Sequence, residues 1–250
     1  MTESGPPFQP FGESHLVGLA ITFVLPFLLA ALVRRSKWRL VERIIAIVLC
    51  VLLFTNYVAY LMFVRKFHPV TWYEALPMQL CDWAMVVIIV ALLTAKRGWF
   101  DVAYFWGIGG TLQALLTPNL PYGWPDLRCI SFFVAHSGII VGVIFMMLVH
   151  RYRPYPSSLL RVIIWTELYF IITYTVDSLT GVNYGFLLHQ PEAFSLLSYL
   201  SKSHFIYIIE FHLLAWVFFS ALYAPFAFWD LFRKRAAPQL EPARPRAGLR

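Results

Sequence analysis

Seven long apolar runs constrain the fold of this chain more than any other feature. Each is about 20 residues long, the length that a helix needs to cross a bilayer core of about 30 Å. Hydrophobic residues make up 60% of the chain and charged residues only 13%, which leaves no room for a soluble domain outside these runs. We therefore predict an all-α fold, a bundle of seven transmembrane helices forming one domain over residues 1–235. The expected spans are 15–32, 44–64, 77–93, 99–116, 129–149, 159–179 and 204–226.

The lysines and arginines are unevenly distributed between the two sides of these spans. With the spans placed as above, 16 of the 20 fall on one side, and positive residues near span ends are retained in the cytoplasm. The bias predicts an N-terminus outside and a cytoplasmic C-terminus. It also accounts for most of the net charge of +7, so we do not interpret that charge as nucleic-acid binding. Residues 236–250 are rich in proline, alanine and charge, and are expected to form a disordered cytoplasmic tail.

Cys81 and His136 are the first candidates for chemistry, because the spans otherwise contain few polar groups. The spans 77–93 and 129–149 both run inward from the outer surface. A rise of 1.5 Å per residue places Cys81 about 6 Å and His136 about 10 Å deep, so the two side chains can meet. A buried thiol needs a base or a helix N-terminus to become a nucleophile. His136 is the candidate base, and Pro77 suits the first position of a helix that begins just before Cys81.

Other polar residues are expected in the same outer half of the membrane. Ionisable groups are costly in hydrocarbon, so this cluster predicts a polar cavity between the third, fifth, sixth and seventh spans. Asp177 or Glu210 is a candidate to orient the imidazole. Glu210 and His212 are two residues apart and point to different helix faces, so we predict neither a metal site nor a cofactor. The supporting cluster comprises Gln79, Asp82, Asn119, Asp177, Asn183, Glu210 and His212.

Three segments resemble a known family. The sequence LPMQLCDW at 76–83 is followed, 55 residues after its cysteine, by the histidine of FFVAHSG, and the later stretch DSLTGVNYGFL covers 177–187. These are similar to YwaF-type bacterial membrane proteins, whose animal relative is the transmembrane protein 164 acyltransferase. The resemblance covers most of the hydrophobic part of the chain and implies a multi-pass protein of the bacterial plasma membrane.

The resemblance also implies an activity. A cysteine would form an acyl thioester, and a histidine would assist in moving a fatty acyl chain between membrane phospholipids, which are the expected partners. Carried onto this sequence, these residues are Cys81 and His136. The chain departs from the family at Gln79, where the family motif LPLHLC has histidine, so any role of that imidazole is not carried over.

Several other interpretations stay open at this point. Cys81 alone is typical of a small packing residue, and it also lies at the same end as Cys129, with which it can form a disulfide that would abolish the nucleophile. His136 can have a structural role instead, as a side chain that hydrogen-bonds to a neighbouring helix. The main functional alternative is a transporter or small-ligand-binding protein without catalytic activity, although the chain has no visible inverted repeat. The sequence leaves the acyl donor, the acceptor and the oligomeric state open.

Overall fold

The computed structural model describes residues 5–36, 38–67, 71–191 and 195–236, and these residues form helices and connecting loops without a strand. The long helices are α1 (Glu13–Ser36), α2 (Arg39–Phe67), α6 (Leu127–His150), α7 (Pro156–Thr180) and α8 (His204–Ala236). Shorter elements are α3 (Leu80–Thr94), α4 (Arg97–Trp106), the π-helix η1 (Gly107–Thr111), α5 (Leu112–Leu116) and the 3₁₀ turns η2 (Tyr184–Phe186) and η3 (Leu196–Tyr199). The all-helical prediction is confirmed.

Five of these helices, α1, α2, α6, α7 and α8, are long and apolar enough to cross a membrane. The helix α3 has only 15 residues, and the expected span 99–116 is built from α4, η1 and α5 in direct succession. These findings establish a multi-pass membrane protein. The count of seven spans and the orientation of the termini stay predictions.

Helix boundaries differ from the predicted spans where the ends are set by backbone capping rather than by hydropathy. The helix α3 begins at Leu80 and not at Pro77, because the Asp82 carboxylate accepts a hydrogen bond from the Gln79 N–H at 3.1 Å and fixes Gln79 as the N-cap. The helices α2 and α8 extend beyond their apolar runs into charged residues. The predicted tail lies outside the described residues, apart from Ala236 at the end of α8.

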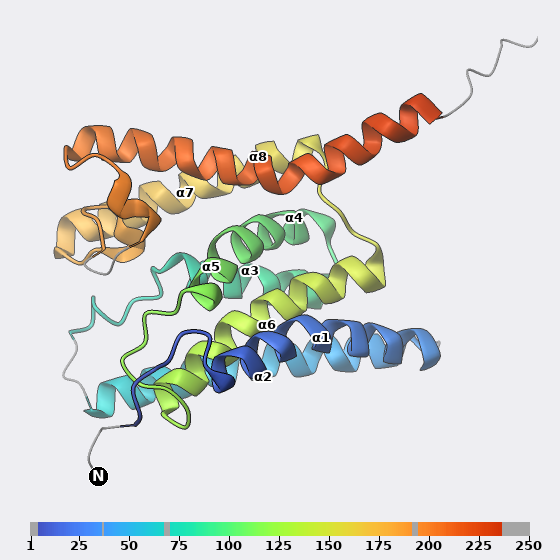
Figure 1. Ribbon diagram of the computed structural model, residues 1–250, viewed down its shortest axis with the longest axis horizontal. Helices are drawn as coiled ribbons and strands as arrows, with labels where there is room; N and C mark the ends of the chain where they lie inside the picture. The colour runs from blue at the N-terminus through green and yellow to red at the C-terminus, as the bar shows by residue number, and fades with distance from the viewer. Residues whose placement is uncertain (1–4, 37, 68–70, 192–194, 237–250) are drawn as a thin grey trace, which may run out of the picture.

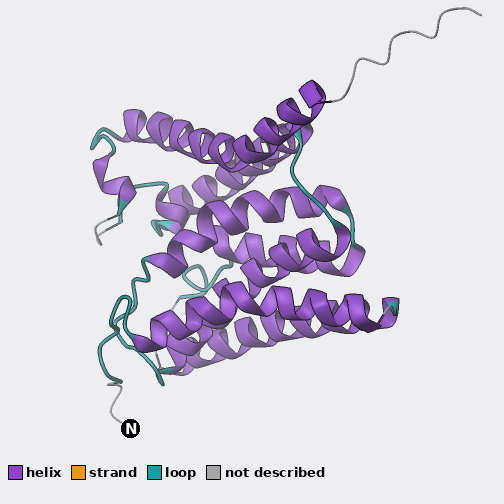
Figure 2. Cartoon of the chain, turned by 45° about the vertical axis from the view of Figure 1, so that its right-hand side comes forward, coloured by secondary structure: helices purple, strands orange, loops and turns teal. Residues whose placement is uncertain are grey.

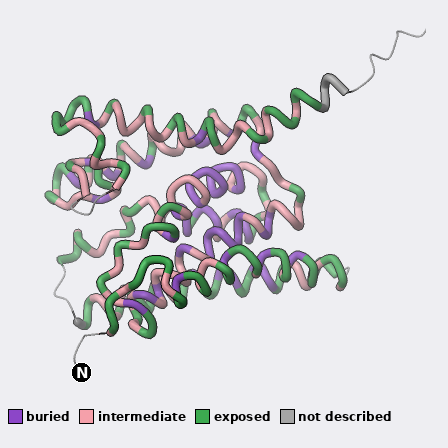
Figure 3. The backbone as a smooth tube through the Cα atoms, in the orientation of Figure 1, coloured by how far each residue is buried: buried purple, intermediate pink, exposed green. Residues whose placement is uncertain are grey.

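The helix α6 lies at the centre of the bundle. It packs against α1 and α2 on one side and against α3, α4 and α5 on the other (Figure 1). Buried residues concentrate in α3, α4 and α6, whereas α1, α2 and α8 carry many exposed apolar side chains such as Leu28, Val48 and Leu213 (Figure 3). Large exposed apolar surfaces are rare on soluble monomers, and here they are the surfaces expected to face lipid.

The hairpin of α7 and α8 forms a separate layer along one side of the other helices. Figures 1 and 2 both show this pair running beside α4. The helix α7 packs on α4, while α8 contacts α7 and η1. At one end of this interface the Asp101 side chain, only 1% exposed, pairs with Arg161 of α7.

We predict that Asp101→Asn destabilises the protein by about 3 kcal/mol. This is the lower end of the range for breaking a buried ion pair, chosen because the Arg161 side chain is 40% exposed. Thermal unfolding in detergent measures the effect. The matched control is Asp230→Asn, which removes the more exposed 2.7 Å pair with Arg153 and is expected to cost under about 1 kcal/mol. Equal losses from the two variants would contradict a structural role specific to Asp101.

Glycines on α6 allow its neighbours to approach closely. A methyl group added at Gly138 would lie 2.7 Å from Leu53 Cδ2 of α2, and Leu53 is fully buried. We expect Gly138→Ala to lower the free energy of unfolding by about 1–3 kcal/mol through overpacking. Gly98→Ala is the control, because its nearest neighbour is 3.7 Å away. Comparison of the two melting temperatures tests the contact, and an unchanged Gly138→Ala protein would refute it.

Candidate functional site

Two cavities meet at the predicted cysteine and histidine. The first, of about 470 Å³, lies among α2, α3, α6 and the loops beside them. The second, of about 450 Å³, lies between the α4–η1–α5 run and the α7–α8 hairpin. Four residues line both cavities: Gln79, Cys81, Asn119 and His136. The structure therefore brings these four predicted site residues together at one junction.

The first turn of α3 positions Cys81. Because Gln79 is the N-cap, Cys81 is the second residue of the helix, closer to its N-terminus than the sequence predicted. The N–H groups in a first turn have no partner within the helix, and together with the helix dipole they favour an anion nearby. The start of α3 thus supplies part of the electrostatic stabilisation that a thiolate needs.

Two hydrogen bonds from α7 and η2 hold this turn in place. The Gly185 N–H of η2 donates to Gln79 Oε1 at 3.1 Å, and the Tyr169 hydroxyl of α7 donates to the Met78 carbonyl at 3.1 Å. The side-chain amide oxygen of Gln79 therefore helps to position the turn that precedes Cys81. Gln79 is also the position at which the chain differs from the family's histidine.

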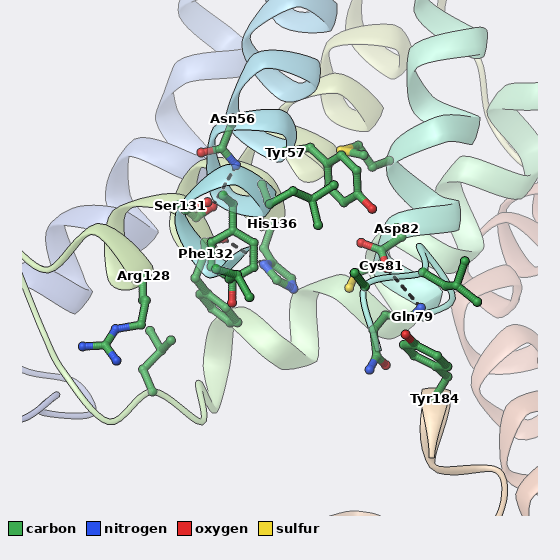
Figure 4. A pocket seen from close by; sticks show the side chains of 18 of the residues that line it. Asn56, Tyr57, Gln79, Cys81, Asp82, Arg128, Ser131, Phe132, His136 and Tyr184 are labelled. Carbon is green, nitrogen blue, oxygen red and sulfur yellow. Dashed lines mark hydrogen bonds between the residues drawn. The ribbon is translucent and has the colours of Figure 1, made fainter. Parts of the chain in front are cut away.

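His136 is held in one tautomer. Its Nδ1 lies 2.8 Å from the Phe132 carbonyl, which can only accept, so Nδ1 carries the proton and donates. The ring stacks on Phe132 at a centroid distance of 4.0 Å and is only 9% exposed. In the neutral imidazole Nε2 is then left as a hydrogen-bond acceptor. Figure 4 shows the His136 ring and the Cys81 thiol on facing walls of the first cavity, with no hydrogen bond joining them.

The start of α6 fixes the position of His136 along this helix. Asp126 is the N-cap residue, and its Oδ1 accepts from the Arg128 backbone N–H at 2.8 Å and from Arg128 Nε at 2.9 Å. These hydrogen bonds from Arg128 hold the pKa of the Asp126 carboxyl below its usual value. The cap is therefore expected to remain ionised at pH values where an ordinary aspartate begins to protonate.

Three members of the predicted polar cluster lie away from both cavities. Asp177 Oδ1 accepts from the Tyr184 N–H at 3.1 Å, and Asn183 Oδ1 accepts from the Leu188 N–H at 2.9 Å. Glu210 Oε2 accepts from the Ser201 N–H at 2.6 Å. These side chains hold the connection between α7 and α8, so neither Asp177 nor Glu210 orients the imidazole. The Phe132 carbonyl does so instead.

The remaining two members lie on cavity walls. Asp82 lines the first cavity while its carboxylate caps α3. His212 lines the second cavity, and its Nε2 lies 3.3 Å from Glu167 Oε2. Its Nδ1 donates to the Ile208 carbonyl at 2.7 Å, so Nε2 is the ring nitrogen that faces the carboxylate. Glu167 is thus the partner of His212, which the sequence did not identify.

Comparison with known proteins decides the family. The model of the TMEM164 family matches residues 10–223, most of the chain. This chain belongs to the TMEM164 family. No curated protein and no solved structure matches it.

The match covers both halves of the junction in this TMEM164 family member, since Cys81 and His136 both fall within it. All three cysteines are free thiols, so the structure does not contain the Cys81–Cys129 disulfide considered from the sequence. Cys129 is buried in α6 and lines neither cavity. Within the described residues, no group of three or more His, Cys, Asp or Glu side chains could hold a metal ion.

The helix α2 contributes polar cavity residues that the sequence analysis missed. Asn56, Tyr57 and Tyr60 line the first cavity, and Asn56 Nδ2 donates to the Ser131 carbonyl of α6 at 3.1 Å. An asparagine and a tyrosine four residues apart lie on one helix face, which was the available signal in an otherwise apolar run. In this TMEM164 family member the wall adds an amide and two hydroxyl groups to a cavity that apolar residues such as Met85 and Ile139 also line.

Proposed function

We propose that this protein is a multi-pass phospholipid acyltransferase or transacylase that works through an acyl-cysteine thioester on Cys81. The observation that carries the proposal is the junction: a thiol at a helix N-terminus and an imidazole with a free acceptor nitrogen line the same two cavities. The resemblance to the transmembrane protein 164 acyltransferase implies the same class of reaction. We further propose seven spans, with the N-terminus outside and the C-terminus in the bacterial cytoplasm.

The first half-reaction loads the enzyme. His136 Nε2 takes the thiol proton as the Cys81 sulfur attacks the ester carbonyl carbon of a phospholipid. Collapse of the tetrahedral intermediate breaks the bond between the carbonyl carbon and the ester oxygen. The imidazolium then returns its proton to the departing lysophospholipid oxygen. Backbone N–H groups in the first turn of α3 favour the negative charge that develops beside Cys81.

The second half-reaction transfers the acyl group from Cys81 to the acceptor. The hydroxyl of an acceptor lysophospholipid gives its proton to Nε2 and attacks the thioester carbonyl. The carbon–sulfur bond breaks, and the imidazolium reprotonates the sulfur. Because His136 is only 9% exposed, the base has little contact with bulk water, which favours transfer to lipid over hydrolysis.

A reconstituted assay tests the proposal. The purified protein is placed in liposomes with a phospholipid that carries an alkyne-tagged acyl chain and with an untagged lysophospholipid acceptor. We expect the tag to appear on the acceptor, together with a protein-bound label that neutral hydroxylamine removes. A folded protein that moves no tag would overturn the proposal and leave the transporter or ligand-binding alternative for these cavities.

A further inference from the structure

The two cavities that meet at Cys81 differ in chemical character. The first is lined by amide, hydroxyl and carboxylate groups from Asn56, Tyr57, Tyr60 and Asp82. The second is lined largely by apolar side chains. They include Phe105, Phe170, Phe211, Leu214, Phe218 and Phe219. The first cavity is therefore the more polar of the two, although Leu61, Met85 and Ile139 also line it, and the second is the more apolar, although Gln113 and Thr117 also line it.

The residues next to Cys81 follow the same division. Leu80 lines only the second cavity and Asp82 only the first, while Cys81 lines both. The ester of a phospholipid likewise joins a polar glycerophosphate part to an apolar chain. A lipid that extends through both cavities would therefore have its scissile carbonyl beside the sulfur.

We infer that the second cavity is the acyl-chain site and that the first receives the glycerol and headgroup of the same lipid. This inference rests on the proposed function and adds the direction in which the substrate lies. The volume of the second cavity, about 450 Å³, is within the range of about 300–1,000 Å³ typical of small-molecule sites. A second observation supports a ligand here, since the nine-tenths buried His136 ring offers an unpartnered Nε2 at the junction.

The backbone of η1 forms part of the wall along this route. Gly109 and Gly110 line the second cavity, and both belong to the π-helix that interrupts the α4–α5 run. A methyl group at Gly110 would lie 3.2 Å from Leu80 Cδ2, and one at Gly109 would lie 3.3 Å from Leu222 Cδ1. These glycines thus let Leu80 and Leu222 pack closely against the π-helix on the wall of the second cavity.

A carboxylate and an imidazole on the wall of the second cavity are paired with each other. Glu167 and His212 lie 3.3 Å apart, and His212 Nδ1 is bonded to a backbone carbonyl. An acyl chain therefore meets a paired carboxylate and imidazole rather than an isolated charge. The cavity lies between the α7–α8 hairpin and the α4–η1–α5 run, so a lipid reaches it by moving sideways between these layers.

The first test measures chain-length preference. Ala114→Phe places a ring in the second cavity, and the matched control Ala135→Phe places the same ring in the first. With oleoyl and octanoyl phospholipids as donors, we expect Ala114→Phe to lower the ratio of oleoyl to octanoyl labelling of Cys81 by about tenfold. Ala135→Phe should lower both labels and leave their ratio unchanged. An unchanged ratio in folded Ala114→Phe, or the same change in both variants, would overturn the assignment.

The second test does not depend on catalysis. The Cys81→Ala protein is incubated with a phospholipid that carries a diazirine at the end of its acyl chain, and the cross-linked peptides are mapped after illumination. We expect cross-links on α7 and α8 from the chain end, and on α2 from a headgroup diazirine. The reverse pattern, or no preference, contradicts the inference. If wild-type protein forms no acyl-Cys81 while this pattern holds, the proposed catalysis fails and the binding assignment stands.

Discussion

Cys81→Ala is expected to abolish the hydroxylamine-sensitive acyl label that wild-type protein acquires from tagged phospholipid. Alanine removes the only atom that can carry a thioester at the junction, because no other cysteine lines either cavity. In-gel fluorescence after attachment of a dye to the alkyne measures the label. Residual labelling should lie at the background of protein without lipid.

The other two cysteines supply matched controls. Cys50 Sγ lies 3.7 Å from the Ile89 carbonyl in the core, and Cys129 is buried in α6. Cys50→Ala and Cys129→Ala are therefore expected to retain the label. Label that persists in Cys81→Ala, or disappears equally from Cys129→Ala with the protein folded, would show that the acyl group is carried elsewhere.

His136→Ala is expected to slow formation of the acyl-enzyme by about 10²- to 10⁴-fold, the usual contribution of a general base. The remaining reaction should accelerate as pH rises, because only thiol that has ionised without help then reacts. A single-turnover time course at several pH values separates this effect from a loss of folded protein, which would lower the amplitude rather than the rate.

His150→Ala is the control on the same helix. It lies at the far end of α6, where its Nε2 is 3.4 Å from Glu42 Oε1, and it lines neither cavity. Its rate should match that of wild-type protein. If His136→Ala forms the acyl-enzyme at the wild-type rate and with the wild-type pH dependence, the imidazole is not the base.

Hydropathy located the long helices, since a continuous apolar run of the right length permits few other structures in lipid. It located boundaries less well. The start of α3 depends on hydrogen bonds around Gln79, and the π-helix at Gly107–Thr111 depends on how neighbouring helices pack against these residues. The Gln79–Asp82 hydrogen bond is local, but hydropathy does not report it, and the packing around the π-helix involves contacts that single-sequence patterns do not contain.

The sequence predicts how deep a residue lies along a helix, and that was enough to predict part of the site. A fixed rise per residue brought Cys81 and His136 to similar depths, and both line the same cavities. Depth does not determine which way a helix face turns. For that reason Asp177 and Glu210 were expected at the cavity but instead hold the connection between α7 and α8, and Asn183 does the same from the loop after α7. Asp101, deeply buried at the opposite end, had no sequence signal for its pairing with Arg161.

The most direct test of a thioester intermediate is a chase followed by mass spectrometry. Protein preloaded from a single phospholipid is digested, and the peptide containing Cys81 is expected to carry the mass of one acyl chain. Adding lysophospholipid should remove that mass and produce one equivalent of new diacyl lipid, at least as fast as steady-state turnover. An acyl group on any other residue, or an acyl-Cys81 that survives the chase while turnover continues, would contradict the mechanism.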